Sequence, residues 1–195
     1  MKRVLDIVFS LAGLLVLFPL FLIISLLIVL DSRGGVLYRQ LRVGRQNKDF
    51  YLYKFRTMKP LSDQMGLLTV GGRDPRVTRI GYYLRKFKLD ELPQLLNVLN
   101  GSMSLVGPRP EVRKYVEMYS DDQKRVLNVK PGITDYASLE YMHENELLAG
   151  SADPEQTYIN EVMPAKLELN RKYIMEAGFF TDLRIIFKTL IRIIF

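Results

Sequence analysis

The apolar run from Val4 to Leu30 constrains the fold of this chain more than any other feature. It reads VLDIVFSLAGLLVLFPLFLIISLLIVL and carries one charge, Asp6. About 20 apolar residues suffice for a helix to cross a bilayer, and this run is longer. A buried core helix is the alternative, but no other segment of the 195-residue chain could surround something so uniformly apolar. We therefore expect residues 1–33 to form a membrane-embedded unit and residues 34–195 to form a second unit.

A proline near the middle of the run decides how this segment can enter a membrane. Pro19 removes a backbone hydrogen bond and presses on the preceding turn, so the helix should kink or break there. Basic residues stand on both sides of the run: Lys2, Arg3, Arg33, Arg39, Arg42 and Arg45. Since Lys and Arg stay on the cytoplasmic side, the pattern favours a re-entrant helix that leaves by the face it entered. A kinked full span remains the alternative. Either arrangement puts residues 34–195 on the cytoplasmic face.

A β-hairpin is predicted over residues 36–58. Two aromatic and branched runs, VLYRQLRV and DFYLYKF, are separated by a polar connection that contains Gly44 and Asn47. Lys54 and Arg56 are two residues apart, so on one strand they should point the same way. The segment over residues 59–75 is rich in Gly, Pro, Ser and Asp and predicts a mobile loop beside a site.

The rest of the chain favours amphipathic helices. Apolar residues from Val77 to Phe87 recur at helical spacing among basic residues, and Asp153-Pro154 marks another helix start, with Pro164 interrupting or restarting that helix. The last 15 residues place Arg184, Lys188 and Arg192 on one stripe of an otherwise apolar helix, which suits a membrane interface. The predicted fold class is α+β and mainly helical, with a membrane-embedded helix, a small hairpin and several interfacial helices.

Composition restricts the chemistry open to the chain. It contains no Cys and one His, which excludes thiol nucleophiles, disulfides and thiolate metal sites, and leaves carboxylates, Lys, Arg, Tyr and hydroxyls. The formal charge is +7 and the pI is about 9.5. Such a chain suits an anionic partner: a nucleic acid, a phosphorylated substrate or an acidic membrane surface.

Two adjacent acids precede a Leu-rich segment in LDELPQLLNVLNG. Leu residues at helical spacing, Pro93 in the first turn and Gly101 past the end predict a helix, which puts Asp90 at or near its N-cap. Capping accounts for Asp90 but leaves Glu91 without a role. A helix N-terminus also attracts phosphate, so the position suits an anionic substrate.

Two arginines flank this segment. Arg85 lies five residues before Asp90, and Arg109 stands between two prolines in VGPRPE, which hold its backbone extended for a bidentate oxyanion. Together with the membrane segment, the acids and arginines indicate phosphoryl chemistry on a membrane-bound acceptor. An Asp carboxylate can accept a phosphoryl group, and Mg²⁺ with oxygen ligands would offset diphosphate charge.

The ordered motifs YKFRTM, LDELPQLLNVLNGSMSLVGPRP and PGIT, behind an apolar segment with a central proline, resemble the small bacterial monotopic phosphoglycosyl transferases. The resemblance covers nearly the whole chain, and the long middle motif is highly specific. It implies transfer of a sugar-1-phosphate from a UDP-sugar to polyprenyl (undecaprenyl) phosphate at the cytoplasmic face of the bacterial inner membrane, with release of UMP. Such a reaction is the first membrane step in glycoconjugate or polysaccharide assembly.

The resemblance also implies residue roles. Asp90 matches the nucleophile, which would carry the sugar phosphate covalently and bind Mg²⁺, and Glu91 would act as a base in the second step. Arg85 and Arg109 match arginines that hold phosphate. Lys54 matches a basic residue of the KFRTM-like motif, and Arg56 is grouped with it as substrate-binding. A homodimer is left open.

Some positions depart from the family pattern. Phe18 precedes Pro19 where many relatives have Ser, Ser102 follows Gly101 and Asp135 follows Thr134. The segment over residues 135–150 matches no family pattern. The alternative function is a non-catalytic membrane scaffold that binds anionic lipid or a pathway partner through its basic helices. No nucleic-acid partner is expected, since the aromatic residues follow apolar periodicity.

Overall fold

The computed structural model describes residues 2–60, 62, 68, 71 and 74–194. The described chain is mainly helical with two small two-stranded sheets, in line with the predicted mixed class. Most of the loop predicted over residues 59–75 lies outside the described residues. The elements in order are α1 (Lys2–Asp31), β1 (Leu37–Val43), β2 (Asp49–Phe55), α2 (Arg79–Lys86), α3 (Gln94–Asn100), β3 (Ser104–Val106), α4 (Arg113–Val116), β4 (Gly132–Thr134), α5 (Tyr136–Glu140), α6 (Glu144–Ala149), α7 (Pro154–Thr157), α8 (Met163–Glu176) and α9 (Phe179–Ile194).

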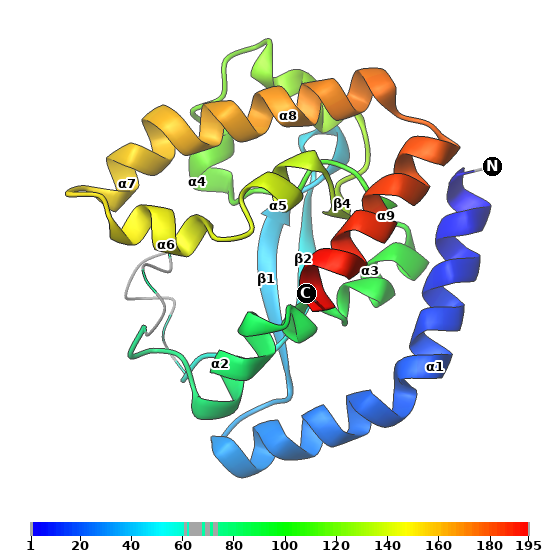
Figure 1. The fold of residues 1–195 in the computed structure, drawn as a ribbon, viewed down its shortest axis with the longest axis vertical. Helices are drawn as coiled ribbons and strands as arrows, with labels where there is room; N and C mark the ends of the chain where they lie inside the picture. Colours follow the sequence, from blue (N-terminus) through cyan, green and yellow to red (C-terminus); the bar gives the residue numbers. More distant parts are fainter. Residues whose placement is uncertain (1, 61, 63–67, 69–70, 72–73, 195) are drawn as a thin grey trace.

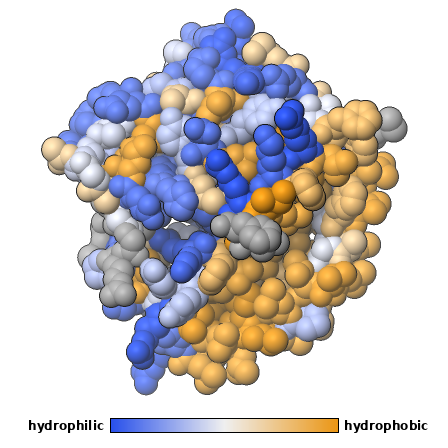
Figure 2. Space-filling view, in the orientation of Figure 1, coloured by the Kyte–Doolittle hydropathy of each residue, from blue (hydrophilic) through white to orange (hydrophobic). Residues whose placement is uncertain are grey.

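Helix α1 is continuous and bent. Pro19 lies inside it, and the helix runs down the right side of Figure 1 before turning beneath the molecule. The sequence allowed a kink or a break, and the structure has a kink, for which the proline is the identifiable cause. By length and composition this is a helix that could cross a membrane. Most of its apolar side chains are exposed, and they form the continuous apolar surface at the right and bottom of Figure 2.

The N-terminal end of α1 is attached to the rest of the chain by polar contacts. The Arg3 guanidinium donates to the carbonyl of Leu99, at the C-terminal end of α3, over 2.7 Å. Asp6 is buried, and its carboxylate accepts from the Ser104 hydroxyl at 2.9 Å and from the Leu105 N–H at 3.1 Å. The one charge within the apolar run therefore binds β3.

The C-terminal end of α1 is attached to the same body. Asp31 Oδ2 accepts from the N–H of Ile80 in α2 at 3.0 Å. The Arg56 guanidinium donates to the carbonyl of Ile28, in the last turn of the helix, at 3.3 Å and to that of Ser32, the residue after the helix, at 2.7 Å. Helix ends leave such carbonyls without intrahelical partners, so Arg56 caps α1 from outside.

The predicted hairpin is confirmed. Strands β1 and β2 pair antiparallel from Leu37 opposite Phe55 to Val43 opposite Asp49. A second sheet, the parallel pair β3 and β4, was not predicted. It forms where VGPRP meets PGIT. A Cβ on Gly132 would lie 2.0 Å from the backbone nitrogen of Gly107, so only two glycines allow this approach.

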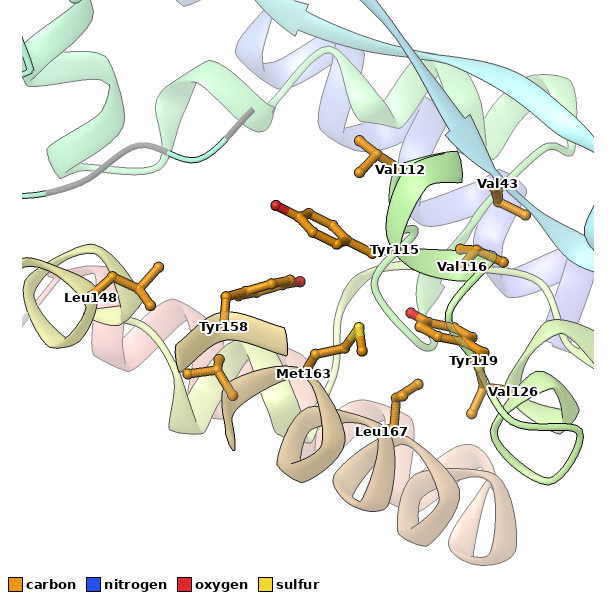
Figure 3. Packing of buried hydrophobic residues seen from close by; sticks show 11 residues of the cluster. Val43, Val112, Tyr115, Val116, Tyr119, Val126, Leu148, Tyr158, Met163 and Leu167 are labelled. Atoms are coloured by element: carbon orange, nitrogen blue, oxygen red, sulfur yellow. The ribbon is translucent and has the colours of Figure 1, made fainter. Parts of the chain in front are cut away.

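A hydrophobic cluster joins β1 and α4 to α8 (Figure 3). The rings of Tyr115 and Tyr158 lie 4.8 Å apart, while Val43 and Leu167 fill the cluster from β1 and α8. Tyr158 begins a π-helical turn, Tyr158–Val162, between α7 and α8. This packing fixes α8 as one wall of the cavity described below.

The other predicted helices are present. Helix α2 falls within the predicted basic stretch, and α9 covers most of the predicted C-terminal helix. Asp153 caps α7 by accepting from the N–H groups of Glu155 and Gln156, both at 3.1 Å. Pro164 lies in the first turn of α8, where the helix resumes after the π-helical turn.

Candidate active site

Asp90 and Glu91 lie in a short 3₁₀ turn, Leu89–Glu91, that joins α2 to α3. Lys88, just before it, has φ of 54°, a left-handed conformation that a non-glycine residue adopts only under strain. The predicted N-cap position of Asp90 needs correction. Helix α3 begins at Gln94, Pro93 is at its N-cap, and no side chain caps it. The reason is that the chain already turns through the 3₁₀ segment, which moves Asp90 a full turn ahead of α3.

The side chain of Asn97 joins α3 to β2 through two hydrogen bonds. Its side-chain oxygen accepts from the Tyr53 N–H at 2.9 Å, and its amide donates to the Tyr51 carbonyl at 2.7 Å. The amide thus pairs with the backbone of β2 as a neighbouring strand would. Lys54 follows on β2, and its Nζ lies 3.3 Å from Glu91 Oε1.

Arg85 reaches the same region from α2. A Cβ on Gly81 would lie 2.1 Å from the Thr57 carbonyl oxygen, so a glycine is needed for α2 to approach the end of the hairpin. Thr78 caps α2 by accepting from the Gly81 N–H at 3.0 Å. The close approach lets Arg85 Nε donate to the Thr57 hydroxyl at 3.0 Å.

Arg109 comes from the segment that follows β3. Its backbone N–H donates to Asp135 Oδ2 at 3.3 Å, and Asp135 also caps α5 by accepting from the Ser138 N–H at 2.6 Å. The Arg109 guanidinium binds Glu91 with two nitrogens, one of them 3.0 Å from Oε2. Such a two-point contact fixes the direction of both side chains.

Glu91 is held by two cations. Burial alone would raise the pKa of its carboxyl, but Arg109 and Lys54 outweigh burial and hold the pKa well below its usual range. The pKa of Arg109 is raised chiefly by Glu91, while burial lowers the pKa of Lys54. Glu91 is therefore a fixed negative charge.

Asp90 differs from its neighbour. It is 6% exposed and, in the described part of the chain, accepts no hydrogen bond and forms no ion pair. Burial raises its pKa, Lys54 and Arg85 act in the opposite direction, and the charge of Glu91 raises it further. Asp90 is the acid of the pair whose oxygens remain available.

Arg56 is the one predicted site residue that lies elsewhere. The Arg56 N–H still donates to the Val36 carbonyl beside β1 at 2.9 Å, but its long side chain extends to the end of α1. It caps α1 instead, and it does not line the cavity that holds the other five.

These five residues line a cavity of about 670 Å³, a size typical of small-molecule sites. The residues that line it differ in polarity according to the helix they come from. Polar and aromatic residues come from the end of α5 to α6 and from α8, among them Tyr141, Glu144, Asn145, Lys166 and Asn170. Apolar residues come from α1, α3 and α9. We call these the polar lobe and the apolar lobe.

The sequence did not reveal the polar lobe. Lys166 and Glu144 form an ion pair of 2.7 Å across α8 and α6, and the Oδ1 atom of buried Asn170 has no hydrogen-bond partner in the described structure. Glu111 is bound by Arg42 at 3.1 Å and by the Tyr158 hydroxyl. The only signal was that residues 135–150 match no family pattern, which marks variation without indicating a role.

The carboxylates offer little for a metal on their own. Among the described residues no group of three or more His, Cys, Asp or Glu gathers in a way that could hold a metal ion. Asp90 is the available carboxylate, since Glu91 is already bound by two cations. Mg²⁺ is commonly held by one or two carboxylates together with substrate phosphates, and Asp90 fits that pattern.

Comparison with known proteins identifies the family. Residues 1–195 match the bacterial sugar transferase family over their full length. The chain belongs to this family. The transferase motifs quoted above are therefore the ones that build the charged end of the cavity.

Three relatives of the chain show which reactions members of this family are named for. It is 38% identical over 97% of its length to the UDP-N-acetylgalactosamine-undecaprenyl-phosphate N-acetylgalactosaminephosphotransferase of Aeromonas hydrophila, covering 42% of that protein. It is 36% identical over 98% of its length to the UDP-glucose:undecaprenyl-phosphate glucose-1-phosphate transferase of Escherichia coli (strain K12), covering 40% of it. It is 39% identical over 98% of its length to the exopolysaccharide production protein PSS of Rhizobium leguminosarum bv. phaseoli, covering 94% of it. The chain thus spans less than half of the first two.

Proposed function

We propose that this chain transfers a sugar-1-phosphate from a UDP-sugar to a polyprenyl phosphate, through a covalent phosphosugar on Asp90. The observation that carries the proposal is the asymmetry of the two acids: Glu91 is bound by Arg109 and Lys54, while Asp90 stays available among cations. Relatives are named for such transfers with undecaprenyl phosphate as acceptor.

In the first step a carboxylate oxygen of Asp90 attacks the phosphorus that bears the sugar. The new O–P bond replaces the bond to the bridging oxygen, which leaves with UMP. Arg85 and Arg109 line the cavity beside Asp90, so they can hold the diphosphate oxygens as charge shifts to the leaving group. Mg²⁺, held by Asp90 and substrate phosphates, would supply further charge neutralisation when bound.

In the second step an oxygen of the polyprenyl phosphate attacks the same phosphorus, and the Asp90 carboxylate leaves. A phosphate monoester has its second pKa near 6, so the acceptor is mostly ionised at neutral pH and needs no strong base. The low pKa of Glu91 also makes it a weak base. We therefore assign Glu91 the positioning of Arg109 and Lys54, in place of the base role that the family resemblance implied.

The polar lobe suits the donor. It combines an ammonium, a carboxylate and amides from Lys166, Glu144, Asn145 and Asn170, which can hydrogen-bond to the hydroxyl and carbonyl groups of a sugar nucleotide. Glu144 and Arg109 line the same cavity, which supports a donor that reaches from the polar lobe to the arginines.

The contacts of α1 support a re-entrant arrangement at the cytoplasmic face. Arg3 and Asp6 bind α3 and β3 at one end, and Asp31 and Arg56 join the other end to α2 and β2. Both ends of the helix thus lie on one body, which supports placing both on the same side of a membrane. The apolar middle of α1 and the exposed apolar residues of α9 would enter the bilayer.

Side-specific labelling tests the arrangement of α1. The chain contains no Cys, so single cysteines at Val4 and Ser32 can be labelled with a membrane-impermeant maleimide in vesicles of known orientation. We expect both to react from the cytoplasmic side. Reaction of the two positions from opposite sides would establish a full span.

The transfer itself is tested with purified protein, Mg²⁺, polyprenyl phosphate and a panel of UDP-sugars, with UMP release as the readout. We expect UMP from at least one donor and none with Asp90→Asn. Asp121→Asn changes a fully exposed carboxylate and is the matched control. Absence of UMP across the panel, from protein shown to be folded and lipid-bound, would favour the scaffold function instead.

A further inference from the structure

The apolar lobe of the cavity begins beside Asp90 and ends at the apolar surface of the molecule. Leu92 and Leu95 follow Asp90 along the chain and line the lobe together with Phe9 of α1 and Leu190 of α9. Phe9 is 49% exposed and Leu190 is 53% exposed, so the lobe opens outward. Figure 2 shows apolar residues covering the side of the molecule on which α1 lies.

Gly13 lines this lobe at a point where α1 and α3 lie close together. A Cβ at Gly13 would lie 3.3 Å from Leu95 Cδ1, in close contact with α3. Glycine inside a helix costs about 1 kcal/mol relative to alanine, so its presence in an apolar run calls for a packing reason. The close approach of Leu95 to α1, at a point where both residues line the lobe, is such a reason.

The two ends of the cavity differ in charge. Lys54, Arg85 and Arg109 line the Asp90 end. The cavity-lining residues of α1, α3 and α9 are apolar apart from Thr189, whose hydroxyl hydrogen-bonds to that of Thr134 at 2.7 Å. A ligand that fills the cavity from the Asp90 end to the apolar surface would have an anionic head and a hydrocarbon tail.

We infer that the apolar lobe between α1, α3 and α9 is the binding site for the first isoprene units of the acceptor. This inference rests on the proposed function and adds a location for the acceptor's tail. With the tail in the lobe, the acceptor phosphate meets Asp90 while the rest of the chain leaves sideways into the bilayer. The donor occupies the polar lobe, so both substrates reach one phosphorus from different directions.

Filling the lobe tests the inference. Gly13→Leu and Leu190→Trp place new side chains in the lobe from two different helices. Ala12→Leu and Ile191→Trp are matched controls, because these neighbouring exposed positions do not line the cavity. The acceptor KM is measured by titrating polyprenyl phosphate at saturating UDP-sugar. The donor step is measured separately, as UMP released in the first turnover without acceptor.

We expect both lobe variants to raise the acceptor KM about tenfold or more, because the displaced isoprene carbons lose their burial. The first-turnover UMP release should stay within about twofold of the parent, and both controls should leave the acceptor KM within about twofold. If Gly13→Leu fails to fold, seen as a lost UMP burst, Leu190→Trp decides the matter alone.

An unchanged acceptor KM in folded lobe variants would overturn the inference, since the lobe would then hold bilayer lipid or nothing. Equal increases in lobe variants and controls would overturn it too, because a general effect on membrane insertion would explain them. A parent protein without a UMP burst would refute the proposed function instead, so the two failures are distinguishable.

Discussion

Two parts of this molecule bury charge, and they use it differently. At the ends of α1, Arg3, Asp6 and Arg56 bind backbone carbonyls, a backbone N–H and a hydroxyl. At the cavity, charged side chains face one another, and Asp90 accepts no hydrogen bond in the described part of the chain. At the ends of α1, polar groups of the fold satisfy each charge. At the cavity, the Asp90 carboxylate remains available to a substrate.

The difference separates stability from activity. A buried charge that is satisfied by backbone groups holds elements together, so its removal leaves several polar groups without partners. A buried carboxylate without a partner is a cost to the fold, which active sites commonly carry. Substitutions in the two regions should therefore have opposite signatures.

The largest effect is expected for Asp90→Asn. The donor step should fall by a factor on the order of 10³ or more, because an amide cannot form the acyl phosphate. The melting temperature should stay equal or rise, because a buried charge is removed. First-turnover UMP release and a thermal melt of the same sample measure the two quantities. A large drop in melting temperature would contradict the contrast between the regions.

Arg109→Lys should have the next largest effect. Lysine keeps the charge but loses the two-point contact with Glu91 and with a phosphate, so kcat/KM for the donor should fall about 100-fold. Arg113→Lys is the matched control, because Arg113 makes exposed contacts with Asn47 and Asp49. Steady-state kinetics with a single UDP-sugar decide the outcome. Equal losses in both variants would show that the site does not use the fork of Arg109.

Glu91→Gln should move the pH profile as well as lower the rate. Asp90 must be ionised to attack, and its pKa is raised by burial and by the charge of Glu91. The acidic limb of kcat/KM for the parent should therefore lie above the ordinary range of an aspartate, and Glu91→Gln should shift this limb to lower pH. Glu155→Gln, at an exposed ion pair with Lys114, should leave it in place. An unmoved limb would show that Glu91 acts only structurally.

Local signals in the sequence predicted most of the elements. Four of these predictions are confirmed, since each depends on neighbours within a few residues: the apolar helix α1, the hairpin, the Asp153 cap of α7 and the helix that follows Asp90. The predicted N-cap position of Asp90 is not. The same locality explains why Lys54, Arg85, Asp90, Glu91 and Arg109 were identified as candidates. The motifs named them, and the structure brings them into one cavity.

The remainder depends on contacts between distant segments. The pairing of β3 with β4 needs Gly107 and Gly132 to touch, and three-residue strands give no periodicity to detect. The polar lobe draws on residues from α6 and α8 that no motif connects. Arg56 was grouped with Lys54, and its contact with the carbonyls at the end of α1 joins segments that no local pattern connects.

The smallest effect on activity is expected for Arg56→Met, which tests whether Arg56 binds substrate or only supports the end of α1. Loss of the guanidinium removes its hydrogen bonds to the carbonyls of Ile28 and Ser32, so the free energy of unfolding should fall by about 1–3 kcal/mol. Arg125→Met, at a side chain that is 73% exposed, should change stability by less than about 0.5 kcal/mol. Kinetics and denaturation of the same preparations separate the two roles. The donor kcat/KM of Arg56→Met should stay within about twofold of the parent. A loss of kcat/KM comparable to that of Arg109→Lys, at unchanged stability, would show that Arg56 binds the substrate.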